Sequence, residues 1–300
     1  MYRGAASLLN KSRRVIMAIF TNQATLSYSG GVVNSNVVTG EILDSLSITK
    51  NPILPTYGYN DTVTYVINIT NSGTTALGGL TLTDDLGAYS FGEMLLTPLT
   101  YIDGTANYYV DGVLQPAPAV VAGPPLVISG LSVPAGGNAL VIYQARVNEY
   151  APLSTDSTIV NTATVTGVGV VQIVSDQATV TVRNEPDLAI TKALSPAVVS
   201  ENGQLTYTFT ILNYGNTEAI ATDNVVISDA FEPILSGISV TYNGALWTEG
   251  VQYNYNDATG IFTTVAGQIT VPAATYVQDP TTGAFTTVPG EAVITVTGTV

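Results

Sequence analysis

The chain contains no cysteine and no histidine among its 300 residues. Thiolates and imidazoles are the usual ligands of zinc, and they also supply common catalytic nucleophiles and bases, so their absence excludes these sites. No disulfide can form, and stability must come from core size or from another covalent bond. The acidic residues follow no recognisable active-site pattern. We therefore expect no metal, no cofactor and no enzymatic activity on an external substrate.

Positive charge is scarce as well. The chain has 8 Lys and Arg against 22 Asp and Glu, which gives a formal net charge of −14. A nucleic-acid-binding protein needs clustered basic side chains to displace phosphate counterions, so nucleic acid is excluded as a partner. The acidity is typical of a surface protein that self-repulsion keeps soluble.

Long apolar runs are also missing. No stretch approaches the roughly 20 apolar residues of a membrane helix, so membrane insertion is not expected. Residues 1–17 carry four basic side chains and the start of a short apolar run, without a small-residue cleavage site. We predict that residues 1–17 are a leader or a disordered segment outside the core. The expected location is extracellular, on a cell surface or in a spore-surface appendage.

Strand-forming sequence is abundant. Hydrophobic residues make up 46% of the chain, and short segments alternate apolar and polar residues. This period of two indicates half-buried strands, which turn formers such as Asn71-Ser72-Gly73 separate. The pattern predicts an all-β fold built from immunoglobulin-like β-sandwiches. The alternating segments are residues 62–70, 80–83, 140–147, 162–166, 178–182, 205–212 and 292–300.

The two halves of the chain repeat each other. Four blocks recur in the same order: residues 47–50 match 189–192, 61–73 match 203–215, 80–84 match 225–229, and 137–147 match 290–300. Self-similarity of this kind indicates a duplicated structural unit. We predict a complete module over residues 45–184 and a second module over residues 185–300.

The closing strands of the module occur in an unexpected place. After the shared blocks, the first module continues with residues 161–167 and 175–182, a pattern typical of a β-hairpin. The second module has no counterpart before residue 300. Residues 22–28 and 35–42, which precede the first module, resemble those two strands instead. We interpret residues 18–44 as a donor β-hairpin, and the second module as one that lacks its closing hairpin.

A sandwich without two strands exposes its core and unpaired backbone groups to water. We expect the hairpin of an identical subunit to complete the second module, because closure within one molecule would have to span the first module. Such head-to-tail contacts build an open homopolymer by strand donation. One alternative is that the chain is a truncated fragment whose own hairpin follows later.

A second alternative is a cell-surface adhesin or stalk fragment that binds carbohydrate or protein. Aromatic side chains gather in the longer inserts of both modules, where they favour either ligand binding or packing. They are Tyr101, Tyr108, Tyr109, Tyr242, Trp247, Tyr253 and Tyr255.

The repeated motifs also resemble a known family. Each module opens with a strand that ends in Ile-Thr-Lys, an aspartate follows a middle strand, and Asn-Thr-Ala-Thr-Val begins the closing hairpin at residue 161. Residues 22–300 thereby resemble the bacterial conserved-repeat surface proteins, the domain-of-unknown-function-11 family. They are also similar to immunoglobulin-like pilus modules that join Lys to Asn by an isopeptide bond. The resemblance implies a structural subunit of a surface or spore-associated fibre.

The resemblance implies an isopeptide bond within the first module, between Lys50 and Asn161, with Asp84 as the acid. A buried amine loses its proton readily and becomes a nucleophile, which makes this chemistry physically sound. Asp85 is a second candidate for the acid. The alternative is an ion pair between Lys50 and Asp84.

In the second module, the same resemblance points to Lys192 and Asp229. No asparagine follows them in the equivalent place. Asn22 of the next subunit is then the implied partner, which would give a covalent chain. The alternative here is an ion pair between Lys192 and Asp229.

Overall fold

The computed structural model describes residues 16–43, 45–170 and 172–300, and this part of the chain is all-β. Its only helical element is a short 3-10 turn, η1 (Ala221–Asp223). The predicted fold class is thus confirmed. In these residues no helix has the length and hydropathy that crossing a bilayer requires.

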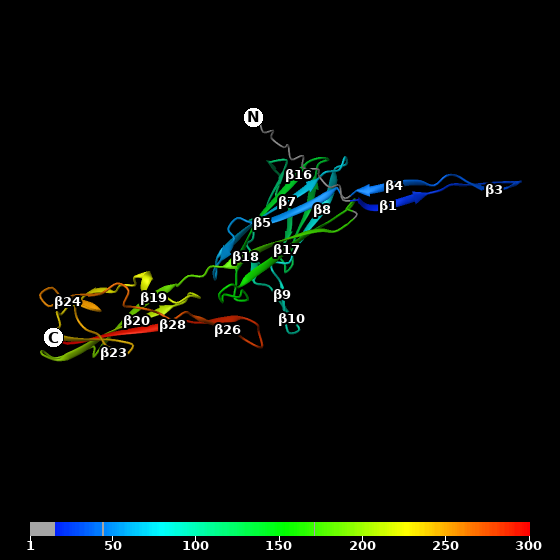
Figure 1. Ribbon diagram of the computed structural model, residues 1–300. Coiled ribbons are helices and arrows are strands. Elements are labelled where there is room, and N and C mark those ends of the chain that lie inside the picture. The colour runs from blue at the N-terminus through cyan, green and yellow to red at the C-terminus, as the bar shows by residue number, and fades with distance from the viewer. Residues whose placement is uncertain (1–15, 44, 171) are drawn as a thin grey trace, which may run out of the picture.

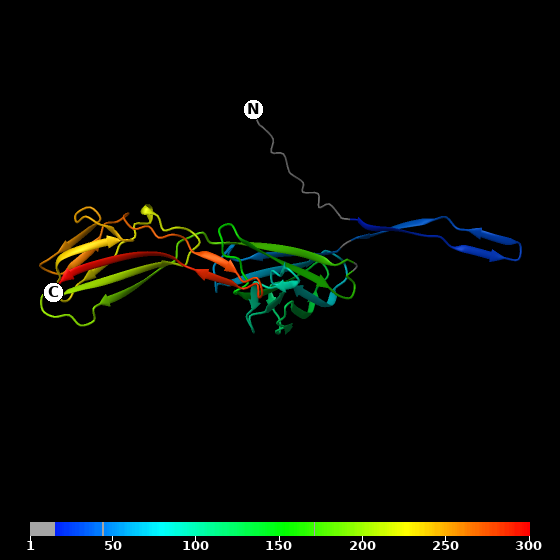
Figure 2. The same cartoon turned by 90° about the horizontal axis from the view of Figure 1, so that it is seen from below.

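An isolated hairpin forms the amino-terminal part. Strand β1 pairs with β4, and β2 pairs with β3 further along the same hairpin. The hairpin projects from the end of the first module that lies opposite the second module (Figures 1 and 2). Its strands are β1 (Ile16–Asn22), β2 (Thr25–Tyr28), β3 (Gly31–Asn34) and β4 (Val38–Leu43).

The first module is a sandwich of two six-stranded sheets. One sheet has the order β13-β12-β16-β7-β5, with β11 also paired to β16, and the other has the order β14-β15-β8-β17-β18-β6. The first comprises β5 (Leu46–Pro52), β7 (Thr62–Asn71), β11 (Leu99–Tyr101), β12 (Asn107–Val110), β13 (Val113–Leu114) and β16 (Asn138–Val147). The second comprises β6 (Thr56–Tyr57), β8 (Leu77–Asp84), β14 (Ala119–Val121), β15 (Leu126–Val133), β17 (Thr158–Thr166) and β18 (Val174–Val182).

The predicted alternation produces the core between these sheets. Along β7, residues Val63, Tyr65, Ile67 and Ile69 are buried, and the residues between them are more exposed. A small hairpin, β9 (Tyr89–Phe91) and β10 (Met94–Leu96), extends from the module.

The second module has a five-stranded sheet in the order β19-β20-β28-β22-β23 and a three-stranded sheet in the order β21-β25-β24. The first comprises β19 (Leu188–Ser195), β20 (Gln204–Asn213), β22 (Ser236–Tyr242), β23 (Ala245–Leu246) and β28 (Gly290–Thr299). The second comprises β21 (Ser228–Ala230), β24 (Tyr253–Asn256) and β25 (Ile261–Thr264).

The duplication extends to individual hydrogen bonds. The side-chain nitrogen of Asn71 donates to the carbonyl oxygens of Thr75, Val133 and Pro134. At the matching position, Asn213 donates in the same way to the carbonyls of Thr217, Val271 and Pro272. Both asparagines are fully buried, so each satisfies the backbone of a bend that the two modules share.

The modules differ where the closing hairpin belongs. In the first module β8 lies between β15 and β17. The equivalent strand β21 pairs with β25, and no second partner occurs among the described residues. The edge of the smaller sheet is therefore open at the place that β17 and β18 occupy in the first module.

The second module also carries an insertion that reaches the first one. The hairpin β26 (Thr275–Gln278) and β27 (Phe285–Val288) extends toward the first module (Figure 1). The Phe285 amide donates to the Glu149 carbonyl at 2.8 Å, and the Gln278 side chain lies 3.3 Å from the Tyr89 hydroxyl. We call residues 275–288 the strut. It braces the joint between the modules.

Candidate functional site

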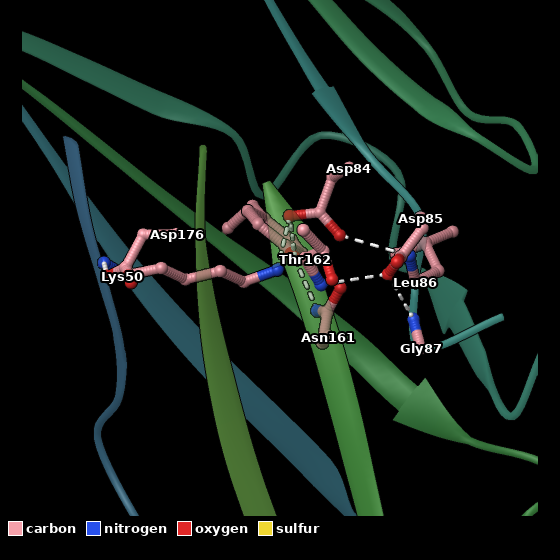
Figure 3. A network of polar contacts seen from close by, with 9 residues as sticks. Lys50, Asp84, Asp85, Leu86, Gly87, Asn161, Thr162 and Asp176 are labelled. Carbon is pink, nitrogen blue, oxygen red and sulfur yellow. Dashed lines mark hydrogen bonds and ion pairs between the residues drawn. The ribbon is translucent and has the colours of Figure 1, made fainter. Parts of the chain in front are cut away.

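A buried polar cluster joins the two sheets of the first module. Lys50 lies on β5 of one sheet, and Asp84 and Asn161 lie on β8 and β17 of the other. The structure thus brings together the three residues that the sequence singled out. Figure 3 shows the Lys50 side chain extended toward the other two.

Short contacts connect the members of this cluster. Lys50 Nζ lies 2.6 Å from Asp84 Oδ2, and both side chains are fully buried. The Tyr143 hydroxyl donates to the same carboxylate oxygen at 2.7 Å. The Asn161 amide nitrogen donates to the Tyr143 hydroxyl at 3.0 Å. Tyr143 therefore connects the carboxylate to the carboxamide, a role that the sequence analysis did not find.

The cluster also contains unpartnered oxygens. Asn161 Oδ1 and the Tyr65 hydroxyl are buried without a hydrogen-bond partner. Burial raises the pKa of the Tyr65 hydroxyl. The nearby Asn161 side chain acts in the opposite direction and lowers that pKa. A buried carbonyl oxygen without a partner is costly, and it has the capacity to accept a hydrogen bond.

Burial dominates the electrostatics of the cluster. It lowers the pKa of Lys50, and the neighbouring Asp84 carboxylate opposes that shift. It also raises the pKa of Tyr143 well above its usual value. Removal of a charged amine from water favours its neutral form, which is the nucleophilic one. The Lys50 ammonium also lies over the Tyr65 ring, 4.7 Å from its centre.

Backbone amides hold the two aspartates in different roles. The Leu86 amide donates to Asp84 Oδ1 at 3.1 Å and leaves the other oxygen for Lys50. Asp85 accepts instead from the amides of Gly87 and Thr162, each at 2.9 Å. Asp84 is therefore the carboxylate in contact with the lysine, and Asp85 ties the corner after β8 to β17.

The second module repeats half of this cluster. Lys192 on β19 forms an ion pair with Asp229 on β21. Its ammonium lies over three rings, 4.2 Å from the centre of Tyr207, with Phe209 and Phe231 slightly farther away. Its side chain is 39% exposed. No asparagine stands in the place of Asn161 among the described residues.

The exposed lysine is part of a wider exposed edge. Strand β5 alternates between buried and exposed residues, whereas every residue of its equivalent β19 is exposed. Ile48 is 9% exposed, and the equivalent Ile190 is 54% exposed. Both strands pair with their neighbours in the same register, so the difference comes from what covers them. In the first module the covering strand is β18, where Asp176 accepts from the Lys50 amide at 2.7 Å.

Asn22, the third predicted residue of the second cluster, lies elsewhere. It ends β1 in the isolated hairpin, where it pairs with Val38 and is exposed. The hairpin and the second module stand at opposite ends of the first module (Figure 2). Within one molecule, therefore, Asn22 is not near Lys192.

The aromatic residues considered for an adhesin are mostly packing residues. The side chains of Tyr101, Tyr108, Trp247 and Tyr253 are buried. Tyr109, Tyr242 and Tyr255 are half-buried. The Tyr108 hydroxyl donates to the Ser132 carbonyl, and Tyr255 likewise donates to Leu235. These two contacts satisfy the hydroxyls of Tyr108 and Tyr255 within the protein. In residues 16–43, 45–170 and 172–300, no three acidic side chains are grouped so that they could hold a metal ion.

The sequence matches no protein-family model and no curated protein. Among solved structures, the major pilin subunit BcpA of Bacillus cereus is 13% identical, with a TM-score of 0.34, over 91% of this chain and 73% of the pilin. The Streptococcus pneumoniae pilus backbone RrgB is 14% identical, with a TM-score of 0.31, over 81% of this chain and 55% of RrgB.

A collagen-binding domain from a Staphylococcus aureus adhesin is 13% identical, with a TM-score of 0.28, over 44% of this chain and 95% of that domain. The structural neighbours of this chain thus include pilin subunits and adhesin domains. Likeness at this level carries no argument about the function of this chain.

Proposed function

We propose that the chain is a structural subunit of a bacterial surface or spore-associated fibre, and that it polymerises head to tail by hairpin donation. The amino-terminal hairpin of one copy would supply the two strands that the second module of the next copy lacks. The partners are identical subunits. Donation adds strands to an open sheet edge, where the backbone provides the affinity and alternate side chains the specificity.

The register of the free hairpin is the observation that carries this proposal. Asn22 pairs with Val38, as Asn161 pairs with Ala178 at the matching position of the closing hairpin. The same agreement holds toward the base of the hairpin. There Ile19 pairs with Glu41, and their counterparts Thr158 and Thr181 pair with each other in the first module. Over residues 19–22 and 38–41, the isolated hairpin is therefore paired as the closing hairpin of a module is. Toward its tip the register shifts by one residue, because Thr25 pairs with Asn34, whereas its counterpart Thr164 pairs with Ser175, the counterpart of Ser35.

Burial of apolar surface supplies the driving force. Phe20, Leu26 and Val38 are each more than half exposed in the free hairpin. The equivalent closing-hairpin residues Ile159, Val165 and Ala178 are almost fully buried. Full burial of a large apolar side chain contributes about 1.5–3 kcal/mol, and the exposed edge of β19 would be covered in the same step.

The position of the hairpin within one molecule favours completion of the second module by the hairpin of another copy. β4 ends at Leu43 and β5 begins at Leu46, so only a short connector joins the hairpin to the first module. The hairpin leaves at the end opposite the second module (Figure 1). When two copies lie end to end, the hairpin of one copy can reach the second module of the other despite its short connector. Repetition of such a heterologous contact produces a filament.

Isopeptide bonds would lock the fibre. In the first module, Asp84 takes a proton from the Lys50 ammonium, and the neutral amine attacks the Asn161 carboxamide carbon. The protonated Asp84 polarises the unpartnered Asn161 oxygen and passes its proton to the departing nitrogen. The attacking nitrogen then gives its second proton to the Asp84 carboxylate, which ends the reaction protonated. A C–N bond forms, another breaks, and one ammonia leaves.

The same reaction across two copies would use Lys192, Asp229 and Asn22 of the incoming hairpin. The partial exposure of Lys192 fits a site that is completed only when the hairpin covers it. Until then, the Lys192 side chain lies over three aromatic rings, partly exposed and without an asparagine to attack among the described residues. Covalent bonding would therefore follow docking.

Point substitutions in the hairpin test the proposal. Val38→Asp places a carboxylate at the position of Ala178, which is 4% exposed in the first module, and should abolish fibres seen by negative stain. Thr39→Asp is the matched control, because its counterpart Thr179 is exposed, and it should assemble. Fibres in both variants would contradict hairpin donation. A wild-type protein that stays monomeric would favour completion by a later segment of the same polypeptide.

A further inference from the structure

The free hairpin and the closing hairpin differ at one inward-facing pair. Phe20 pairs with Gly40, and the matching pair in the first module is Ile159 with Val180. Ile159 and Val180 are both buried between the sheets. The two pairs contain the same number of side-chain carbon atoms. In the free hairpin, all of them belong to one flat aromatic side chain, so the shape of the pair differs from that of isoleucine with valine.

The geometry of the free hairpin depends on this pair. A Cβ placed on Gly40 would lie 2.3 Å from Phe20 Cζ, well inside van der Waals contact. The phenyl ring therefore lies across the backbone of residue 40, and glycine leaves the space that it occupies. The ring is still 51% exposed, so much of its surface is available to a partner.

The first module has no room for a ring at this place. A Cβ placed on Gly87 would lie 2.5 Å from Ile159 Cγ2, so the corner after β8 already packs tightly against isoleucine. A flat ring at the place of Ile159, with glycine at the place of Val180, would fill this close-packed space differently. It would leave a gap over residue 180 and force neighbouring side chains out of their preferred rotamers, and both effects destabilise the fold.

The core of the second module is built differently, and Phe231 lies just before its corner, where Leu86 precedes Gly87 in the first module. Three aliphatic core residues of the first module, Ile67, Leu86 and Leu126, correspond to Phe209, Phe231 and Phe262. Phe231 stacks on Tyr207 with 4.8 Å between the ring centres, and Phe262 lies 5.7 Å from Phe231. Aromatic groups of this kind gain additional energy from a further ring at the edge of the cluster.

We infer that the Phe20–Gly40 pair determines which module the hairpin enters: it matches the aromatic core of the second module of another copy and does not fit a first module. This inference rests on the proposed hairpin donation. As a result, the hairpin of an incoming subunit cannot replace β17 and β18, and each subunit has one acceptor site. The chain grows without branches.

The test compares two double variants of the full chain. Phe20→Ile with Gly40→Val gives the free hairpin the pair found in β17 and β18. It should slow seeded elongation, followed by light scattering, by at least about tenfold, as expected for loss of a buried aromatic anchor. Neither residue belongs to the core of a module among the described residues, so the subunit should still fold, which circular dichroism verifies.

The control is Thr21→Val with Thr39→Val, the neighbouring pair that faces outward. Its counterparts Val160 and Thr179 are exposed, so wild-type elongation is expected. Equal elongation of the two double variants and the wild type would overturn the specificity of the pair and leave hairpin donation intact. A wild-type chain that forms no fibres would overturn hairpin donation itself.

Discussion

Lys50 and Lys192 occupy the same register position, opposite Ile67 and Phe209, yet Lys50 is fully buried and the Lys192 side chain is 39% exposed. The two strands have the same sequence pattern and the same neighbours within their sheets. Strand β18 covers Lys50, and among the described residues no equivalent strand covers Lys192. This accounts for the different exposure of the two lysines. One chain therefore contains the same lysine–aspartate pair in a buried and in a partly exposed form.

The Asp84 carboxylate should be essential for the stability of the first module. Asp84→Ala leaves the Lys50 ammonium buried without its counterion, which costs about 3–5 kcal/mol in other buried pairs. Urea unfolding followed by circular dichroism measures the loss. Trp247, the single tryptophan, lies in the second module, so its fluorescence transition should move less.

Glu185→Gln is the control for that experiment. It removes an ion pair with Arg183 in which both side chains are exposed, and such pairs contribute less than about 1 kcal/mol. Losses of similar size in the two variants would show that the buried pair is not a special element of stability.

The buried tyrosines should make the first module sensitive to alkali. Burial raises the pKa of Tyr65 above its ordinary value of 10.0, so the folded state holds this proton when the unfolded state releases it. Stability from this group is complete below pH 10 and falls as the pH rises further, by up to about 1.4 kcal/mol per pH unit. Tyr65→Phe should reduce that slope in unfolding experiments between pH 9 and 11.

At neutral pH the same substitution should have little effect. The Tyr65 hydroxyl is buried without a hydrogen-bond partner, and its removal changes the unfolding free energy by less than about 1 kcal/mol. Tyr143→Phe is the comparison, since its hydroxyl contacts both Asp84 and Asn161. It should destabilise the module measurably. A larger effect of Tyr65→Phe would reverse the roles assigned to the two hydroxyls.

The isopeptide proposal predicts a change in mass. Denatured wild-type monomer should weigh one ammonia less than its sequence, and Asn161→Ala should restore the full mass. Fibres boiled in detergent should run as a ladder on a gel. Lys192→Ala should reduce that ladder to monomer while the fibres still form by hairpin donation. Full mass in the wild-type monomer would leave Lys50 and Asp84 as an ion pair.

The strut should restrict motion between the modules. The Tyr276 hydroxyl donates to the Tyr214 carbonyl at 2.8 Å, and the ring packs against the first core, so Tyr276→Ala weakens the brace. Because the chain has no cysteine, spin labels can be placed at Val113 and Leu246 alone. The distance distribution between them should broaden. Val277→Ala, beside it and 57% exposed, should leave the distribution narrow.

Much of this architecture follows from local sequence. Alternation at residues 62–70 places Tyr65 and Ile67 in the core, and the repeated blocks predict the shared register. The hairpin begins at Ile16, two residues earlier than predicted, because strand pairing continues past the part that resembles β17. Residues 1–15 lie outside the described part, and a leader there stays a prediction.

Contacts between distant segments were not predictable. Tyr143 occupies an inward position of a predicted strand, but its hydrogen bond to Asp84 joins residues 59 positions apart. The sequence of the strut looks like an ordinary hairpin, and its function depends on Tyr89 and Glu149 in the other module. Period-two patterns identify which side of a strand is buried, and they carry no information on which partner lies there.

The strut has a mechanical consequence for a fibre built from this subunit. At the equivalent place, the first module has only a tight connection between Val133 and Asn138, without an inserted hairpin. Joints within a subunit would be braced, and joints between subunits would not. Under a sideways load such a fibre would bend at the joints between subunits, which are every second joint between modules. The length of one subunit would therefore set the spacing of the flexible points.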